Sequence, residues 1–169
     1  MNTSGPSLWS TAAPYIAAIV AASAILLAAW VSHSAKISEF RQNWINDLRR
    51  DIADYVGAAE MWFRKWDEIN PLLTEDKEAR ERNELFPLAN AARVILWRIR
   101  LRLNPRQNQY KAEDDALLQS LLDLLDPSKV DPKNQEAAWL RLADRTVEQA
   151  REILKREWQV TKQFPLLRR

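Results

Sequence analysis

The sequence contains no cysteine, a single histidine (His33) and only two glycines among its 169 residues. Without cysteine the chain has no disulfide, no thiol nucleophile and no thiolate metal site. One histidine leaves almost nothing from which to build a metal cluster or a histidine-based general base. The distant glycines Gly5 and Gly57 cannot form a glycine-rich phosphate loop. These shortages predict a protein that is not an enzyme and that uses no metal or cofactor.

Formal charge is also missing from the start of the chain, because every acidic and basic side chain lies beyond position 35. This uncharged part contains an almost unbroken apolar run over residues 15–31. About 20 apolar residues, each rising about 1.5 Å in a helix, cross the ~30 Å hydrocarbon core of a bilayer. We therefore predict a transmembrane helix over residues 9–32. The expected organisation is a transmembrane segment, 1–35, and a cytoplasmic helical domain, 36–169.

Two features predict how this helix is oriented. A cleaved signal peptide is the alternative reading, but it needs a basic N-terminal region, and residues 1–7 contain no Lys or Arg. The first basic side chains, Lys36 and Arg41, follow the apolar run. Because positive charge marks the cytoplasmic side of a membrane helix, we predict a retained single-pass anchor with its N-terminus outside and its C-terminus inside.

Small side chains occur on several faces of the predicted membrane helix. Alanines four residues apart let helices approach closely in lipid, which favours an oligomer over an isolated alanine-rich anchor. A ring of such helices would enclose a narrow apolar pore, of the kind that gates by dewetting. Residues predicted to line the pore or the subunit interface are Ala17, Ala18, Ala21, Ala22, Ser23, Ala24, Ala28 and His33.

A regular apolar seam follows the membrane segment along residues 36–69, and this helix can continue the membrane helix without interruption. Its steps alternate between three and four residues, as in a heptad repeat. Two interpretations stay open, a parallel coiled coil between subunits or a core that faces the chain's own helices. The seam consists of Ile45, Leu48, Ile52, Tyr55, Ala59, Trp62, Trp66 and Ile69.

Prolines divide the rest of the chain into further predicted helices. The first covers residues 74–103, with Thr74 as its N-cap and a kink or division at Pro87. Later helices are expected over 112–125 and 135–163, with a loop over 126–134 between them. The overall prediction is an all-α fold, in which a single N-terminal transmembrane helix precedes an antiparallel cytoplasmic helical bundle that oligomerises.

The arginine-rich end of the 74–103 helix is the best local indication of a ligand. On a helix Arg98 and Arg102 share one face, and Arg106 and Lys111 follow in the chain. Arginine beside an aromatic side chain, here Trp97, is typical of phosphate and base recognition. Two alternatives stay open. The arginines, which the predicted topology puts near the inner leaflet, can attract anionic lipid headgroups, or they can pair with nearby acids.

Pairs of acidic residues offer little for catalysis. Asp47 with Asp51 and Asp114 with Asp115 lie in charge-rich stretches, and we predict solvated helix faces there. A Ser–His–Asp triad is excluded because the only histidine, His33, lies at the expected membrane edge.

Two stretches resemble a known group of proteins. They run from Lys36 to Arg49 (Lys-Ile-Ser-Glu-Phe-Arg-Gln-Asn-Trp-Ile-Asn-Asp-Leu-Arg) and from Ile99 to Pro105 (Ile-Arg-Leu-Arg-Leu-Asn-Pro). Both are similar to small bacterial single-pass membrane proteins with a helical cytoplasmic domain, some of which are membrane effectors of anti-phage systems. The Hailong-type effector, a tetrameric channel controlled by a nucleotide-oligomer signal, has this build. The resemblance implies a bacterial inner membrane, a tetramer and a nucleotide or oligonucleotide signal.

The sequence and the resemblance together lead to two functional hypotheses. The first is an oligomeric membrane effector or ion channel of a bacterial anti-phage system, gated through its cytoplasmic helical domain. The second is a membrane-tethered adaptor or scaffold that binds a protein partner and has no pore. Eight tryptophans are consistent with the second hypothesis, because interface cores favour Trp. The expected partners are membrane lipid, further copies of the chain, and either the nucleotide signal or a protein.

Overall fold

The structure is a computed structural model that describes residues 8–103 and 110–162. Every regular element within these ranges is helical, which confirms the predicted all-α class. In chain order the elements are α1 (Leu8–Ile69), α2 (Thr74–Arg80), the π-helical turn η1 (Glu81–Leu85), α3 (Phe86–Arg102), α4 (Lys111–Asp123), the 3-10 turn η2 (Pro127–Lys129) and α5 (Gln135–Lys162).

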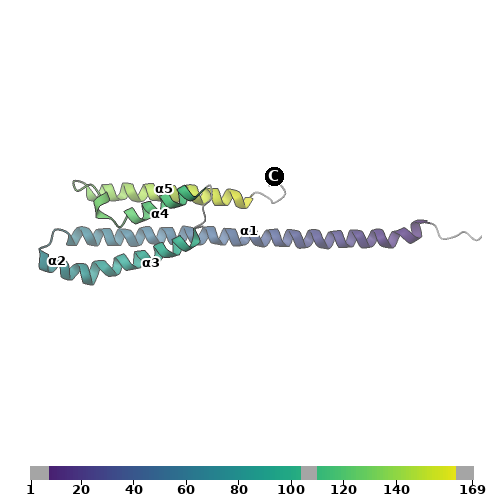
Figure 1. Cartoon of the computed structure of the whole chain (residues 1–169), viewed down its shortest axis with the longest axis horizontal. Helices are drawn as coiled ribbons and strands as arrows, with labels where there is room; N and C mark the ends of the chain where they lie inside the picture. Colours follow the sequence, from purple (N-terminus) through teal and green to yellow (C-terminus); the bar gives the residue numbers. More distant parts are fainter. Residues whose placement is uncertain (1–7, 104–109, 163–169) are drawn as a thin grey trace, which may run out of the picture.

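Helix α1 is the longest element, with 62 residues in one uninterrupted run. At about 1.5 Å per residue it is about 93 Å long. Its apolar first half projects beyond the other helices, as Figure 1 shows. Within the described part of the chain, one helix is long and apolar enough to cross a membrane, and none of the residues in its most apolar stretch is buried. The prediction that one continuous helix joins the apolar run to residue 69 is confirmed.

The second half of α1 is the axis around which the other helices pack. Helix α3 runs back along one side of it, and α4 and α5 lie on the other side (Figure 1). All residues of the predicted seam are buried against these helices except Trp66, which is half-buried. The seam therefore faces a core formed by the chain's own helices, which decides between the two interpretations left open by the heptad spacing.

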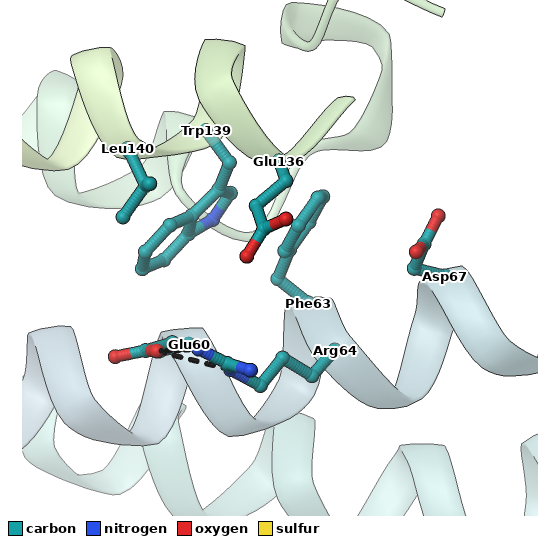
Figure 2. A pocket seen from close by; sticks show the side chains of 7 residues that line it. All are labelled: Glu60, Phe63, Arg64, Asp67, Glu136, Trp139 and Leu140. Atoms are coloured by element: carbon teal, nitrogen blue, oxygen red, sulfur yellow. Dashed lines mark hydrogen bonds and ion pairs between the residues drawn. The ribbon is translucent and has the colours of Figure 1, made fainter. Parts of the chain in front are cut away.

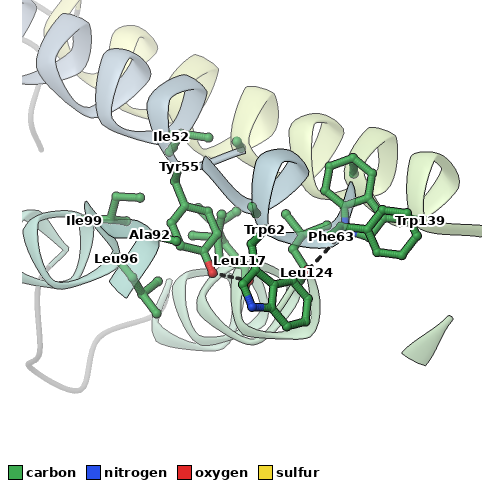
Figure 3. Close-up of a cluster of buried hydrophobic side chains, with 14 of the residues drawn as sticks. Ile52, Tyr55, Trp62, Phe63, Ala92, Leu96, Ile99, Leu117, Leu124 and Trp139 are labelled. Carbon is green, nitrogen blue, oxygen red and sulfur yellow. Dashed lines mark hydrogen bonds between the residues drawn. The ribbon is translucent and has the colours of Figure 1, made fainter. Parts of the chain in front are cut away.

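Two aromatic side chains in the core donate hydrogen bonds to carbonyl groups at the end of α4 (Figure 3). The last carbonyl groups of a helix lack the regular partner four residues later, and the Leu121 carbonyl accepts only a long bond, 3.3 Å, from the Leu124 N–H. The Tyr55 hydroxyl of α1 donates a hydrogen bond to the Leu121 carbonyl at 2.6 Å, and burial raises the pKa of this tyrosine. The Trp139 indole of α5 donates to the Leu124 carbonyl at 3.1 Å. Trp139 also stacks on Phe63 of α1 at 5.4 Å between centroids, so α1 and α5 fix α4 together.

One local prediction about the segment from Thr74 onward needs correction, and the predicted division at Pro87 is confirmed. Thr74 is not an N-cap, because it is already helical and the extended residue Leu73 precedes it without a side-chain cap. The break at Pro87 is a π-helical turn, η1, directly before α3. Proline lacks an N–H group and crowds the carbonyl four residues earlier. We infer that the wider turn of a π-helix accommodates this mismatch while the chain stays helical.

The later helices lie close to their predicted bounds. Helix α4 begins one residue before the predicted start at Ala112 and ends two residues before Leu125. The predicted loop contains η2, where the Asp126 carboxylate accepts a hydrogen bond from the Ser128 N–H at 2.9 Å. This interaction with Ser128 lowers the pKa of Asp126. Helix α5 matches its prediction as far as Lys162, and the remaining residues, 163–169, lie outside the described part.

Candidate functional site

The basic end of α3 lies beside two aspartates of α1. The Arg102 Nε atom is 2.7 Å from Asp51 Oδ2, and its Nη1 atom is 3.3 Å from Asp47 Oδ2. The Arg98 Nη1 atom is 3.4 Å from Asp51 Oδ1. Both guanidinium groups therefore hold one carboxylate, that of Asp51, which is 3% exposed. We call these four residues the α1–α3 ion-pair cluster.

The prediction that the acid pairs form solvated faces is wrong for Asp51 and also for Asp114. Asp51 lies three residues after Leu48 and four before Tyr55, which places it on the buried face of α1. Asp114 precedes the buried Leu117 by one helical turn and is 6% exposed. A carboxylate tolerates such burial only when it is paired with positive charge, and in both cases the partner is a distant arginine.

A second group of charges joins the start of α4 to the end of α5. Arg156 Nη2 lies 3.0 Å from Asp114 and 3.2 Å from Glu157, and its Nη1 lies 2.6 Å from Glu113. The guanidinium also covers the Tyr110 ring at 4.3 Å. Burial disfavours the charge of Arg156, but the hydrogen bonds to its acids outweigh burial and raise its pKa. Sequence reasoning missed this cluster, although an acid on the apolar face of the α4 helix was a readable signal.

The described residues among the four predicted to bind a ligand do not all have the same ion-pair partner. Arg98 and Arg102 meet at Asp51. Lys111 pairs with Asp115 on its own helix at 2.7 Å, and Arg106 lies outside the described residues. The observed contacts of Arg98 and Arg102 are those of the ion-pairing alternative. Their role as an anion clamp stays a prediction.

The position of the cluster also bears on the lipid alternative. Asp51 follows His33 by eighteen residues of continuous helix, which is about 27 Å along the axis. The apolar run ends before His33, so this length of helix separates Arg98 and Arg102 from the apolar run. This spacing argues against the predicted position of these arginines beside the inner leaflet.

The residues predicted to line a pore or a subunit interface are uncovered in the single chain. All eight are exposed. The Ser23 hydroxyl donates to the Ile19 carbonyl at 2.8 Å, so its hydrogen-bonding need is met within α1. The side chains concerned are Ala17, Ala18, Ala21, Ala22, Ser23, Ala24, Ala28 and His33. Their role at a pore or interface stays a prediction.

A cleft of about 280 Å³ opens between α1 and α5 (Figure 2). Phe63 and Trp139 lie between its charged side chains, and one of its carboxylates, Glu60, pairs with Arg64 at 2.7 Å. In the part of the chain that the structure describes, no three His, Cys, Asp or Glu side chains are grouped to hold a metal ion. The cleft is lined by Glu60, Phe63, Arg64, Asp67, Glu136, Trp139 and Leu140.

Comparisons with known proteins do not assign the chain to a family. No family model, no curated protein and no solved structure matches the chain. The resemblance of residues 36–49 and 99–105 to bacterial membrane effectors therefore stays a prediction, as does the absence of enzymatic activity.

Proposed function

We propose that the protein is an oligomeric membrane effector, an ion channel of a bacterial anti-phage defence system, gated through its cytoplasmic helical domain. The observation that carries this proposal is the continuity of α1 from its apolar first half into the buried core. A rotation or tilt of the packed half reaches the apolar half directly, because no loop lies between them. Such small rigid shifts of helices are a common means of switching.

The proposed topology is a single pass through the bacterial inner membrane, with the C-terminal helical bundle in the cytoplasm. Lys36, Arg41, Arg49 and Arg50 follow the apolar run and support this orientation by the positive-inside rule. The exposed alanines of the apolar half would contact neighbouring copies and surround a pore. The resemblance suggests four copies.

Gating is proposed to act through the α1–α3 ion-pair cluster. Asp51 ties α3 to α1 through Arg98 and Arg102. A phosphate-bearing signal, such as a nucleotide or oligonucleotide, offers the same bidentate chemistry to guanidinium groups as a carboxylate. Its binding would compete with Asp51 and would loosen α3 from the helix that enters the membrane.

A helix break between the membrane and the core tests this coupling. Glu39 is exposed on α1 and lies between the apolar run and Ile45, the first buried core residue. Proline at this position removes a backbone hydrogen bond and kinks the helix, whereas alanine removes the same charge and keeps the helix. Because the proposed channel opens only when α3 is released, the parent of this experiment carries Asp51→Asn, which removes the charge that holds Arg98 and Arg102. The experiment expresses this parent, and the same chain with Glu39→Pro or Glu39→Ala, in bacteria and records membrane potential with a voltage-sensitive dye.

We expect the parent and Glu39→Ala to depolarise the cells, and Glu39→Pro to leave the potential unchanged at an equal membrane level. Depolarisation by Glu39→Pro equal to that of the parent would contradict coupling through a continuous helix. An unchanged potential with the parent chain would contradict the channel itself.

A membrane-tethered adaptor is the second candidate, and the exposure of Trp97 on α3 favours it. This indole is 57% exposed, and exposed tryptophans are frequent at the centres of protein interfaces. A fragment of residues 36–169 distinguishes the candidates, because all buried core residues lie within it. An adaptor keeps partner binding as this soluble fragment, whereas a channel loses all activity.

A further inference from the structure

Helix α3 has two apolar faces, of which only one is used by its own chain. The inner face packs in the core through Ala92, Leu96 and Ile99. On the opposite side four large apolar side chains follow one another at helical spacing and reach solvent. They are Phe86 (54% exposed), Val94 (52%), Trp97 (57%) and Leu101 (86%). A helix of a soluble domain normally buries one stripe and presents polar residues on the other side, so this exposed stripe indicates a contact surface.

The exposed stripe lies in a basic setting. Helix α3 contains four arginines and no acidic residue. Arg93 and Arg100 lie along one edge of the stripe and Arg98 along the other, by their helical positions, and all three are exposed. We call these three arginines and the four apolar residues the outer face of α3. A surface that fits it has apolar side chains and negative charge.

Helix α4 in a second copy of the chain offers such a surface. It has four acids against one basic residue. Glu113 and Asp114 pair with Arg156 of α5, which leaves Asp123 and Asp115, the latter paired with Lys111 of the same helix. Its exposed line contains Ala112, Asp115, Gln119 and Leu122, spaced by three or four residues. Within one chain α3 packs mainly on α1 and α4 mainly on α5, although both helices border one groove.

The fold also sets where these two surfaces lie along the direction of α1. Arg93 and Leu122 line the same groove, of about 310 Å³. Arg93 lies near Tyr55 of α1, whose hydroxyl bonds the Leu121 carbonyl, so Arg93 and Leu122 lie at one level along α1. Helices α3 and α4 run in opposite directions (Figure 1). Seven residues from this level toward the membrane-side end, α3 has Arg100 and α4 has Asp115. Apolar residues therefore lie at one level of both helices, and opposite charges lie two turns away.

We propose that the outer face of α3 docks onto the exposed line of α4 in a second copy of the chain. A rotation that relates two copies about an axis parallel to α1 leaves each residue at the same position along that axis. Neighbouring copies can then bring Val94 beside Leu122, and Arg100 beside Asp115. The contact is heterologous, joining two different surfaces, and such contacts generate rings when the rotation closes. This inference rests on the proposed oligomer and specifies its cytoplasmic interface.

The absence of native cysteine makes a disulfide test specific. The experiment co-expresses full chains that carry Val94→Cys with full chains that carry Leu122→Cys, oxidises the membranes and examines the chains on a non-reducing gel. Each variant is also expressed alone. The matched control pairs Val94→Cys with Leu140→Cys, because Leu140 is 47% exposed on α5, outside the proposed contact.

A disulfide-linked dimer is expected only when Val94→Cys and Leu122→Cys are present together. A dimer of Val94→Cys alone would mean that α3 meets α3, and would overturn the proposal. No dimer in the mixture, while native mass spectrometry finds an oligomer, would overturn this interface and leave the proposed function standing. A monomer by native mass spectrometry would remove the interface and the channel together.

Charge reversal gives an independent measurement on the same contact. Arg100→Glu and Asp115→Arg are each expected to reduce the yield of the 94–122 disulfide several-fold. The two reversals combined in every chain restore opposite charges across the contact, and the yield should recover. Arg145→Glu, on the exposed side of α5, is the control and should leave the yield unchanged. Equal yields in all variants would contradict the charge pairing and with it the proposed interface.

Discussion

Asp51 is the residue at which the charges of two helices meet. It lies among apolar side chains on α1, yet Arg98 and Arg102 reach it from α3. A buried ion pair contributes little net stability compared with apolar residues of the same shape, but the loss of one partner leaves an unpaired buried charge. The cluster therefore makes the contact of α3 with α1 sensitive to whatever changes the charge at either arginine.

Substitutions at Arg102 test this role in stability. Arg102→Ala leaves Asp51 with only the longer contact to Arg98, and the free energy of unfolding should fall by about 1–3 kcal/mol. Arg102→Lys should recover part of the loss, since one ammonium group cannot serve both Asp51 and Asp47 as a guanidinium does. Urea denaturation measures the change. Arg145→Ala, at an exposed site on α5, is the control and should stay within about 0.5 kcal/mol of the parent. Parent-like stability of Arg102→Ala would contradict the cluster.

Activity of the same substitutions at Arg98 and Arg102 separates ligand binding from lipid attraction. A phosphate clamp depends on planar guanidinium geometry, so Arg→Lys should reduce the depolarisation induced by the signal almost as much as Arg→Ala does. Attraction to anionic lipid depends mainly on charge, so Arg→Lys would be nearly silent. Activity, membrane association and melting temperature are measured in parallel. Activity that lysine keeps and alanine loses, with unchanged stability, would eliminate the clamp.

Low pH should weaken the ion pairs of a different group of residues, the one around Glu84. Hydrogen bonds from Arg80 and then Lys65 lower the pKa of Glu84 from 4.5 to about 2. Because the folded-state pKa lies below the unfolded value, this carboxylate stabilises the fold above pH 4.5 and loses its effect as the pH falls toward 2. Glu84→Gln should therefore melt below the parent at pH 7 and together with it near pH 2. Glu78→Gln, exposed on α2, is the control, and a pH-independent difference for Glu84→Gln would contradict the assignment.

At the scale of elements, the seam of α1 is the feature that organises the helical domain. Ile52 is 5% exposed, whereas its neighbour Ala53 points to solvent. Ile52→Asp places an unpaired charge in the core at a cost of several kcal/mol, and should unfold the helical domain. Ala53→Asp adds the same charge one residue along and should melt close to the parent. Equal melting temperatures for the two variants would contradict the observed register.

The apolar half of α1 should be sensitive to the size of its small side chains. Ala21 and Ala22 are exposed in the single chain, and leucine at either position would hold neighbouring helices apart in lipid. Ala21→Leu and Ala22→Leu should weaken subunit association, measured as the fraction of oligomer in detergent. Ile19→Leu keeps the side-chain volume and is the control. If both leucine variants assemble like the parent, the small-residue argument fails.

The helices could be predicted from sequence because their causes are local. Apolar spacing and proline fix where α1, α4 and α5 lie, to within a few residues. The π-helical turn before Pro87 could not be predicted, since proline signals a break but not the geometry that accommodates it. The burial of Asp51 was missed because apolar spacing counts only apolar residues. Its partner Arg102 is fifty-one residues away, and no local rule connects the two.

At the scale of the whole molecule, one helix of about 93 Å carries both the apolar segment and the axis of the helical core. Under the proposed function, this continuous helix couples events at the core to the apolar segment. In the proposed oligomer, the exposed alanines of its apolar half and the outer face of α3 both contact further copies. An assembly in which these surfaces are covered would be a ring of chains with parallel α1 helices.

Counting the subunits of the full chain in lipid nanodiscs by native mass spectrometry tests this account most directly. We predict a single species that contains several copies, four if the resemblance extends to subunit number, and that dissociates in Ala21→Leu and Ala22→Leu. A strict monomer, in nanodiscs that retain the chain, would contradict the oligomeric channel and leave the adaptor as the function that fits the structure.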